Sequence, residues 1–309
     1  FIELRYIDSG STFKTVLIYH IERGELYALK KRQDTNKKTD KLIKREFDNY
    51  SKIHHPLMPK FIGVGQNNKY LIIEYINGQT LQSIDELELN FNDKITIFFE
   101  LMIIIEFLHR KGFIYRDLKP NNIMIDENKT AVLIDFDRII EKKNSFFTTT
   151  NDFSSLFHAP EVNTNNFSYE CDIYSLGCVF LYIMNPNIPF EQSLNEISKS
   201  NEFQEIKEII IKSINKESNE RPSILEMIFK IYISYSKNIQ ISNLFETYIT
   251  NFTEYYKTDK TSENKTNQNL VITQFYLGLL YEDGELIPRD MNKSIHYYSL
   301  ASNQNYSSA

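Results

Sequence analysis

Residues 113–125 of the chain are FIYRDLKPNNIMI, and LIDFDRI follows shortly after them. The first stretch carries a carboxylate, a lysine and an amide at a fixed spacing, as Asp117, Lys119 and Asn122. The second stretch adds Asp135, eighteen residues after Asp117. The apolar runs NIMID and AVLID flank the polar turn ENKT, which predicts two short β-strands. A loop rich in charged and amide groups is therefore expected just before a β-hairpin.

The first 82 residues are predicted to form mainly short strands. TVLIYHI and ELYALKK flank a turn at Arg23 and Gly24, as in a hairpin. One helix, KLIKREFDNYSKI, interrupts the strands, because its apolar residues follow helical spacing. Residues 92–232 are mainly helical in pattern. The chain is therefore expected to have an α+β fold with a β-rich first part.

A long buried helix is predicted at residues 92–112, because apolar residues occur in almost every turn of it. Asn92 or Asp93 is expected to cap its start, and Gly112 to end it. Further helices are expected around residues 172–184 and 203–214, and from Ser223 onward.

Lys30 and Glu46 are predicted to form an ion pair. Lys30 shares one strand face with Ala28, because alternate residues of a strand point the same way. Glu46 lies between Ile43 and Tyr50 on the apolar face of its helix, where an unpaired carboxylate would be costly to bury. A lysine partner removes that cost.

Three more motifs follow in order along the chain. HAPEV contains Glu161, CDIYSLGCVF contains Asp172 and Gly177, and ERPSILEM contains Arg221. Taken with the stretches above, the chain as far as residue 232 resembles the eukaryotic protein kinase family, in its Ser/Thr or tyrosine-kinase-like branch. DLKPNN in particular resembles serine/threonine kinases.

This resemblance implies a bilobal fold, with a small β-rich N-lobe at residues 1–76 and a helical C-lobe at residues 77–232. It also implies that Arg221 pairs with Glu161 as a marker of the fold. Transfer of the γ-phosphate of ATP to protein hydroxyls, with Mg²⁺, is the implied activity.

The resemblance also assigns roles to individual residues. Asp117 would accept or orient the proton of the attacking hydroxyl, and Lys119 would neutralise the transferring phosphoryl group. Asn122 and Asp135 would hold Mg²⁺, because a hard cation requires such oxygen ligands. The residues expected to bind ATP are Lys30, Glu46, Val16, Ala28, Glu74, Ile76, Met124 and Gly10.

The chain departs from the family pattern at three places. In YIDSGSTFKTVL only Gly10 remains of the glycines that let backbone N–H groups approach phosphates. Tyr115 stands where the family has histidine, and an aromatic ring can serve the same packing role. Asp137 replaces a glycine after Phe136, which is expected to alter the switching of this segment more than the chemistry.

Regulation by phosphorylation is a further expectation. Arg116 precedes Asp117, as in kinases whose activation loop is ordered by phosphorylation. The alternative is a loop that is merely polar and mobile. The candidate acceptors between Asp137 and Glu161 are Thr148, Thr149, Thr150, Ser154 and Ser155.

The C-terminal part is predicted to be separate from the kinase-like part. Residues 233–269 are polar and are expected to be a linker with one helix, ISNLFETYITNF. Residues 270–309 resemble a Sel-one-like repeat, a helical hairpin whose small residues Gly278 and Ala301 let two helices approach closely. A single repeat cannot bury its apolar face alone, so this one is expected to be the first of an array that binds a protein partner. The alternative is an isolated helical hairpin.

Composition limits the other possibilities. The net charge of −6 and the pI of about 5.6 give no electrostatic sign of nucleic-acid binding. No apolar run reaches membrane-spanning length, so no membrane partner is expected. Cys171 and Cys178 are too far apart on one helix for a disulfide, and we interpret them as core thiols of a reducing, cytoplasmic compartment.

Three functions remain open at this point. The first is an active serine/threonine kinase. The second is a pseudokinase scaffold or adaptor that binds nucleotide weakly or not at all, which the poor glycine-rich loop would favour. The third makes the C-terminal repeat the working part and the kinase-like part its regulator.

Overall fold

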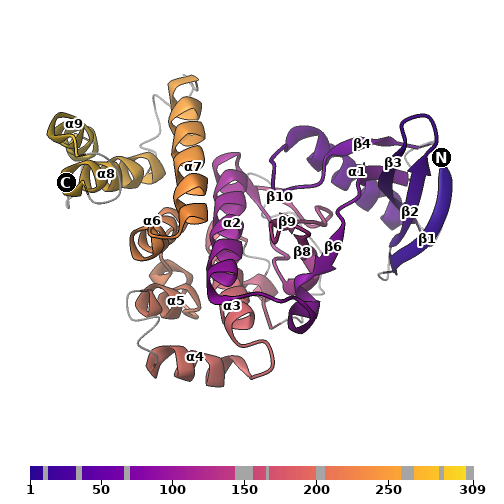
Figure 1. The fold of residues 1–309 in the computed structure, drawn as a ribbon, viewed down its shortest axis with the longest axis horizontal. Helices are drawn as coiled ribbons and strands as arrows, with labels where there is room; N and C mark the ends of the chain where they lie inside the picture. Colours follow the sequence, from indigo (N-terminus) through magenta and orange to yellow (C-terminus); the bar gives the residue numbers. More distant parts are fainter. Residues whose placement is uncertain are drawn as a thin grey trace.

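The protein has a β-rich lobe and a helical lobe, and the first strand and the last helix lie at opposite ends of the molecule (Figure 1). This computed structural model is described for residues 1–9, 13–32, 37–65, 70–142, 156–164, 167–199, 206–258, 268–284 and 289–303.

The β-rich lobe is built on one antiparallel sheet with the strand order β1-β2-β3-β5-β4. The strands are β1 (Ile2–Ser9), β2 (Phe13–His20), β3 (Glu25–Arg32), β4 (Phe61–Val64) and β5 (Tyr70–Glu74). The predicted β2–β3 hairpin is confirmed.

The hairpin turns at Gly24, whose φ of +69° lies in the left-handed region that glycine adopts without strain. The predicted helix is also present, as α1 (Lys37–Lys52). It packs against the sheet through edge-to-face contact of Phe47 with Phe61, with ring centroids 5.4 Å apart.

Two small sheets at the lobe boundary carry the loop identified in the sequence. β6 (Gly78–Thr80), β8 (Ile123–Asp126) and β9 (Ala131–Leu133) form one, and β7 (Phe113–Ile114) pairs with β10 (Ile140–Glu141) in the other. The strands predicted around ENKT are therefore confirmed, and the loop between β7 and β8 is held at both ends.

The close pairing of β6 with β8 depends on a glycine. A Cβ atom at Gly78 would lie 2.1 Å from the carbonyl oxygen of Ile125, which no side chain could accommodate.

The centre of the helical lobe is α2 (Phe91–Arg110), as predicted. Its predicted N-cap was wrong, because Asn90 caps the helix. The Asn90 side chain accepts the Asp93 N–H and the Asp93 carboxylate accepts the Asn90 N–H, which makes Asp93 the third helical residue of a capping box. Gly112 follows the helix with a φ of +83°.

Among the remaining helices of this lobe, α3 and α6 pack on α2, and α4 and α5 pack on α3. The predicted helices near residues 172, 203 and 223 are present, whereas α4 was not predicted. The elements are α3 (Tyr169–Met184), α4 (Phe190–Lys199), α5 (Lys207–Ser213) and α6 (Ile224–Tyr235), with short 3₁₀ turns at Leu81–Glu86, Pro120–Asn122, Pro160–Thr164 and Ser218–Glu220.

The α3 helix carries Cys171 and Cys178, which are buried and free, as predicted. Across the parts of the chain that the structure describes, no helix has the length and apolar character needed to cross a membrane.

The segment expected to be a linker, residues 233–269, contains a long helix, α7 (Ile239–Thr258), that packs on α2 and α6. Ile241 is fully buried, and the ring of Phe245 stacks on Tyr232 with centroids 3.7 Å apart. This part of the predicted linker therefore contributes to the core of the helical lobe.

Two further helices, α8 (Gln268–Asp283) and α9 (Met291–Ser302), pack against each other. The ring of Tyr276 on α8 stacks on Phe229 of α6, with centroids 4.6 Å apart and an interplanar angle of 10°. The helical hairpin of α8 and α9 is therefore attached to the helical lobe through the contact of α8 with α6 (Figure 1).

Candidate active site

A cavity of about 650 Å³ lies where the β-rich sheet faces the loop between β7 and β8. Its volume is in the usual range of small-ligand sites. Most residues singled out in the sequence line it: Ala28, Lys30, Glu74, Ile76, Asp117, Lys119, Asn122, Met124 and Asp135.

Of the described residues predicted to bind ATP, Val16 and Glu46 do not line the cavity, and Glu46 acts through its ion pair with Lys30. Val16 is wrong: it pairs with Leu29 and packs with Ile18 and Tyr27 on the other face of the sheet. Because successive strand residues point to opposite faces, its neighbour Thr15 lines the cavity instead. Gly10, which was also predicted to bind ATP, lies outside the described residues.

The predicted pair between Lys30 and Glu46 is confirmed. The Lys30 Nζ lies 2.6 Å from Glu46 Oε1 and 3.1 Å from Asp135 Oδ1. The Glu46 side chain is only 1% exposed, so it depends on this cation. Although burial opposes it, the carboxylates of Asp135 and Glu46 raise the pKa of Lys30 well above its usual value. Lys30 is therefore a permanent positive charge at the cavity wall.

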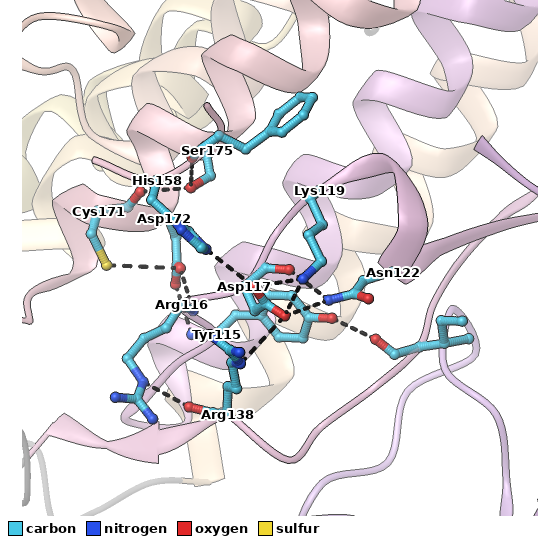
Figure 2. A network of polar contacts seen from close by, with 12 residues as sticks. Tyr115, Arg116, Asp117, Lys119, Asn122, Arg138, His158, Cys171, Asp172 and Ser175 are labelled. Atoms are coloured by element: carbon cyan, nitrogen blue, oxygen red, sulfur yellow. Dashed lines mark hydrogen bonds and ion pairs between the residues drawn. The ribbon is translucent and has the colours of Figure 1, made fainter. Parts of the chain in front are cut away.

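Asp117 is the centre of a polar network (Figure 2). Its carboxylate accepts hydrogen bonds from Lys119 Nζ at 2.9 and 3.1 Å and from Asn122 Nδ2 at 2.8 Å. His158 Nε2 lies 3.1 Å from Oδ1, and Arg138 Nε lies 3.7 Å from Oδ2. Burial opposes ionisation, but the hydrogen bond with His158 and the charges of Lys119 and Arg138 hold the pKa of Asp117 below its usual value. Asp117 is therefore a carboxylate at neutral pH.

A second buried carboxylate, Asp172 on α3, fixes the backbone of the loop. It accepts the N–H groups of Tyr115 at 2.9 Å and Arg116 at 2.8 Å, and His109 Nε2 lies 2.8 Å from it. Arg116 has a φ of +71°, an unfavourable value for a side-chain residue. The bonds to Asp172 hold this strained conformation just before Asp117.

Tyr115 has the packing role expected of an aromatic residue at its position. Its hydroxyl donates to the carbonyl of Ile134, and its ring meets that of Phe136 edge-on with centroids 5.8 Å apart. The tyrosine therefore supports the segment that carries Asp135.

The oxygen atoms of Asn122 and Asp135 fit a hard cation. The Asn122 amide nitrogen donates to both the backbone oxygen and the carboxylate of Asp117, so its amide oxygen can face another partner. Asp135 is 35% exposed at its side chain and lines the same cavity. Mg²⁺ is commonly held by one or two protein oxygens together with substrate phosphates, so this donor set is sufficient.

Asp137 also lines the cavity. Burial raises its pKa to about 7, with further contributions from Asp135 and Glu46. Its φ is not positive, unlike that of Asp135 at +65°. The expected conflict between aspartate and a glycine conformation therefore does not arise in this arrangement.

Three arginines come together beside the cavity. Arg116 Nε donates to the Arg138 carbonyl at 2.6 Å, and burial followed by the nearby charge of Arg45 lowers the pKa of Arg116 to about 10. The charges of Arg45 and Arg138 both disfavour the charge of Arg116, so a nearby anion would stabilise it. The candidate phosphorylation residues Thr148, Thr149, Thr150, Ser154 and Ser155 lie outside the described residues.

The predicted pair of Arg221 with Glu161 is confirmed, at 2.5 and 2.9 Å through both guanidinium nitrogens. His158 and Arg45 were missed by the sequence reasoning. The contact of His158 with Asp117 spans 41 residues, and no spacing rule connects them. Arg45 precedes the predicted Glu46, but a lone helix arginine is more often a surface residue.

Comparison with known proteins agrees with this geometry. The family model described as "Protein kinase domain" matches residues 1–275. A "Probable serine/threonine-protein kinase" of Dictyostelium discoideum is 31% identical over 60% of this chain and 32% of its own length. "Serine/threonine-protein kinase D" of Synechocystis sp. is 29% identical over 55% of this chain and 36% of its own. "Ribosomal protein S6 kinase 2 alpha" of Xenopus laevis is 29% identical over 74% of this chain and 32% of its own.

The chain thus spans about a third of the length of these relatives. The family model, however, covers most of this chain and includes both lobes and the cavity between them. The chain belongs to the protein kinase family.

Proposed function

We propose that this protein is a serine/threonine kinase that transfers the γ-phosphate of ATP to protein hydroxyls. The observation that carries the proposal is the meeting of Lys30, Asp117, Lys119, Asn122 and Asp135 around one cavity. Two of the similar proteins are named as serine/threonine kinases, which supports the choice of acceptor.

The cavity offers separate places for the parts of ATP. Adenine would lie between Ala28 and Met124, next to the backbone of Glu74 to Ile76. Lys30, held by Glu46, would contact the phosphates as a fixed positive charge.

Asp117 is the group we assign to the substrate hydroxyl. As a carboxylate with several donors around it, it can orient the hydroxyl and accept its proton as the new bond to phosphorus forms. Lys119, 2.9 Å from the same carboxylate, can offset negative charge on the transferred group. Asn122 and Asp135 would hold Mg²⁺, which supplies charge neutralisation at the phosphates when bound.

Regulation by phosphorylation is part of the proposal. Arg45, Arg116 and Arg138 form a positive cluster, and a phosphate on Thr148, Thr149, Thr150, Ser154 or Ser155 would relieve their mutual repulsion.

The C-terminal hairpin supports a second role, in partner binding, as a Sel-one-like repeat. At Gly278 of α8 a Cβ would lie 2.7 Å from the ring of Tyr298 on α9, which is the close helix approach expected of such a repeat. We therefore assign residues 1–76 to the N-lobe, 77–232 with α7 to the C-lobe, and 270–309 to the repeat.

Free, buried cysteines favour a cytoplasmic location.

The experiment is incubation of the purified protein with Mg²⁺, ATP and a basic protein substrate, followed by mass spectrometry. Phosphate on Ser or Thr is expected with the wild type and not with Asp135→Asn. Absence of phosphate from a folded wild-type sample would contradict the kinase and favour the scaffold. Phosphate found only on Tyr would contradict the proposed specificity.

A further inference from the structure

One face of α1 holds the segment that carries Asp135. Glu46, Asn49 and Tyr50 are spaced three and four residues apart, so they project from the same side of the helix. All three side chains are almost fully buried, and all three reach Phe136.

The three contacts involve different parts of Phe136. Its backbone N–H stabilises the carboxylate of Glu46, which already pairs with Lys30. Its carbonyl accepts the amide N–H of Asn49 at 2.9 Å. Its ring meets the ring of Tyr50 edge-on, with centroids 5.0 Å apart. The carbonyl and the ring of Phe136 are therefore both held by a single helix.

Asn49 makes a second contact in the same segment. Its amide nitrogen lies 3.4 Å from the carbonyl of Ile139, so one side chain spans both ends of residues 136–139. With 6% of its surface exposed, Asn49 has little water to replace these bonds. Losing the amide would leave two backbone oxygens without this donor.

The position of Asp135 depends on these contacts between α1 and residues 136–139. Asp135 has a φ of +65°, which costs free energy and persists only when the surroundings impose it. The next residue, Phe136, is the one that α1 holds. We propose that Asn49 is a positioning residue of the phosphate-transfer site, which keeps Asp135 turned toward the cavity by binding the carbonyls at both ends of residues 136–139. The inference rests on the proposed kinase function for its catalytic consequence, but not for its structural one.

The test compares wild type with Asn49→Leu, which has nearly the same size and no donor. Ser51→Ala, on the exposed side of the same helix, is the matched control. Hydrogen–deuterium exchange with peptide-level mass spectrometry gives a readout independent of activity. Exchange at residues 136–139 is expected to be roughly tenfold faster in Asn49→Leu, with exchange in α2 and α3 unchanged.

Kinetics give the second readout. In Asn49→Leu we expect a lower kcat and a several-fold higher Mg²⁺ concentration for half-maximal rate, because Asp135 is no longer held in place. If the role of Asn49 were purely structural, the variant would contain less folded protein. The folded enzyme that remains would need the same Mg²⁺ concentration for half-maximal rate as wild type. Asn49→Ser, which keeps a small polar group but cannot span both carbonyls, serves if the leucine variant does not fold.

The outcomes separate the two proposals. Exchange at residues 136–139 within twofold of wild type in a folded Asn49 variant would overturn the positioning role. If wild type transfers no phosphate but exchange is faster in the variant, the proposed kinase function is refuted. The structural role of Asn49 in holding residues 136–139 is then retained. Faster exchange together with unchanged Mg²⁺ dependence in an active enzyme would overturn the catalytic consequence.

Discussion

Replacing Arg221 with methionine should destabilise the helical lobe strongly. The Arg221 side chain is fully buried and binds the carboxylate of Glu161, itself 15% exposed, through two nitrogens at 2.5 and 2.9 Å. It also donates to the carbonyls of Asn215, Glu170 and Lys216 at 2.8, 2.9 and 3.2 Å. The substitution leaves a carboxylate and three carbonyls without this partner.

Breaking a buried pair by removing one charge costs roughly 3–5 kcal/mol, because the other charge stays buried. In a lobe of this size that loss lowers the melting temperature by on the order of 10 °C. Urea unfolding followed by circular dichroism measures the change. Lys212→Met, which breaks an exposed pair with Glu208, is the matched control and should leave the midpoint unchanged.

The double variant Glu161→Leu, Arg221→Met should recover part of the loss, because it removes the orphaned carboxylate. A loss of under about 1 kcal/mol in Arg221→Met, or a double variant less stable than the single one, would refute the reasoning.

Three other variants test separate parts of the structure. Tyr276→Ala removes the stack on Phe229, and we expect faster hydrogen exchange in α8 and a stability loss of about 3 kcal/mol; unchanged exchange there would refute the packing of α8 on the lobe. Gly278→Val should separate α8 from α9 at a cost of about 1–3 kcal/mol, because the ring it meets is fixed by a hydrogen bond to Glu282; wild-type stability would contradict this. Burial raises the pKa of Glu100 to about 8, so the folded state binds this proton more tightly than the unfolded state and loses stability as pH rises from 5 to 8. The free energy of unfolding of Glu100→Gln should therefore rise by about 3 kcal/mol relative to that of wild type between pH 5 and pH 8, as measured by unfolding titrations. A difference between the two proteins that does not change with pH would rule the explanation out.

Much of the site could be predicted because its motifs are local. Asp117, Lys119 and Asn122 lie within six residues, and the strand–turn–strand that follows them fixes their order in space. The Lys30–Glu46 pair was predictable for a different reason, since a carboxylate on an apolar helix face requires a cation.

The errors have equally physical causes. Val16 was assigned to the wrong face because a one-residue shift in register reverses every side chain of a strand. The N-cap was misplaced by two or three residues because Asn90, Asn92 and Asp93 all suit a helix start, and only the bonding pattern distinguishes them. The helix α4 was missed although Leu194 and Ile197 follow helical spacing.

The contacts of His158 and Asn49 could not be predicted from spacing. Asn49 reaches Phe136 across 87 residues, and such a bond depends on how α1 and the loop are brought together by the whole fold. A buried asparagine on a helix indicates that a partner exists, but it does not say where along the chain the partner lies.

The most direct measurement of the central claim is the rate of γ-phosphate transfer from ATP to a serine peptide, with Mg²⁺, for wild type and Asp117→Asn. Glu208→Gln, which also replaces a carboxylate with an amide but on an exposed side chain, is the control. We predict transfer by wild type and by the control, and a roughly 10²–10⁴-fold lower rate for Asp117→Asn, because that variant cannot accept the hydroxyl proton. Equal rates in all three folded proteins, or no transfer by any of them, would contradict the account.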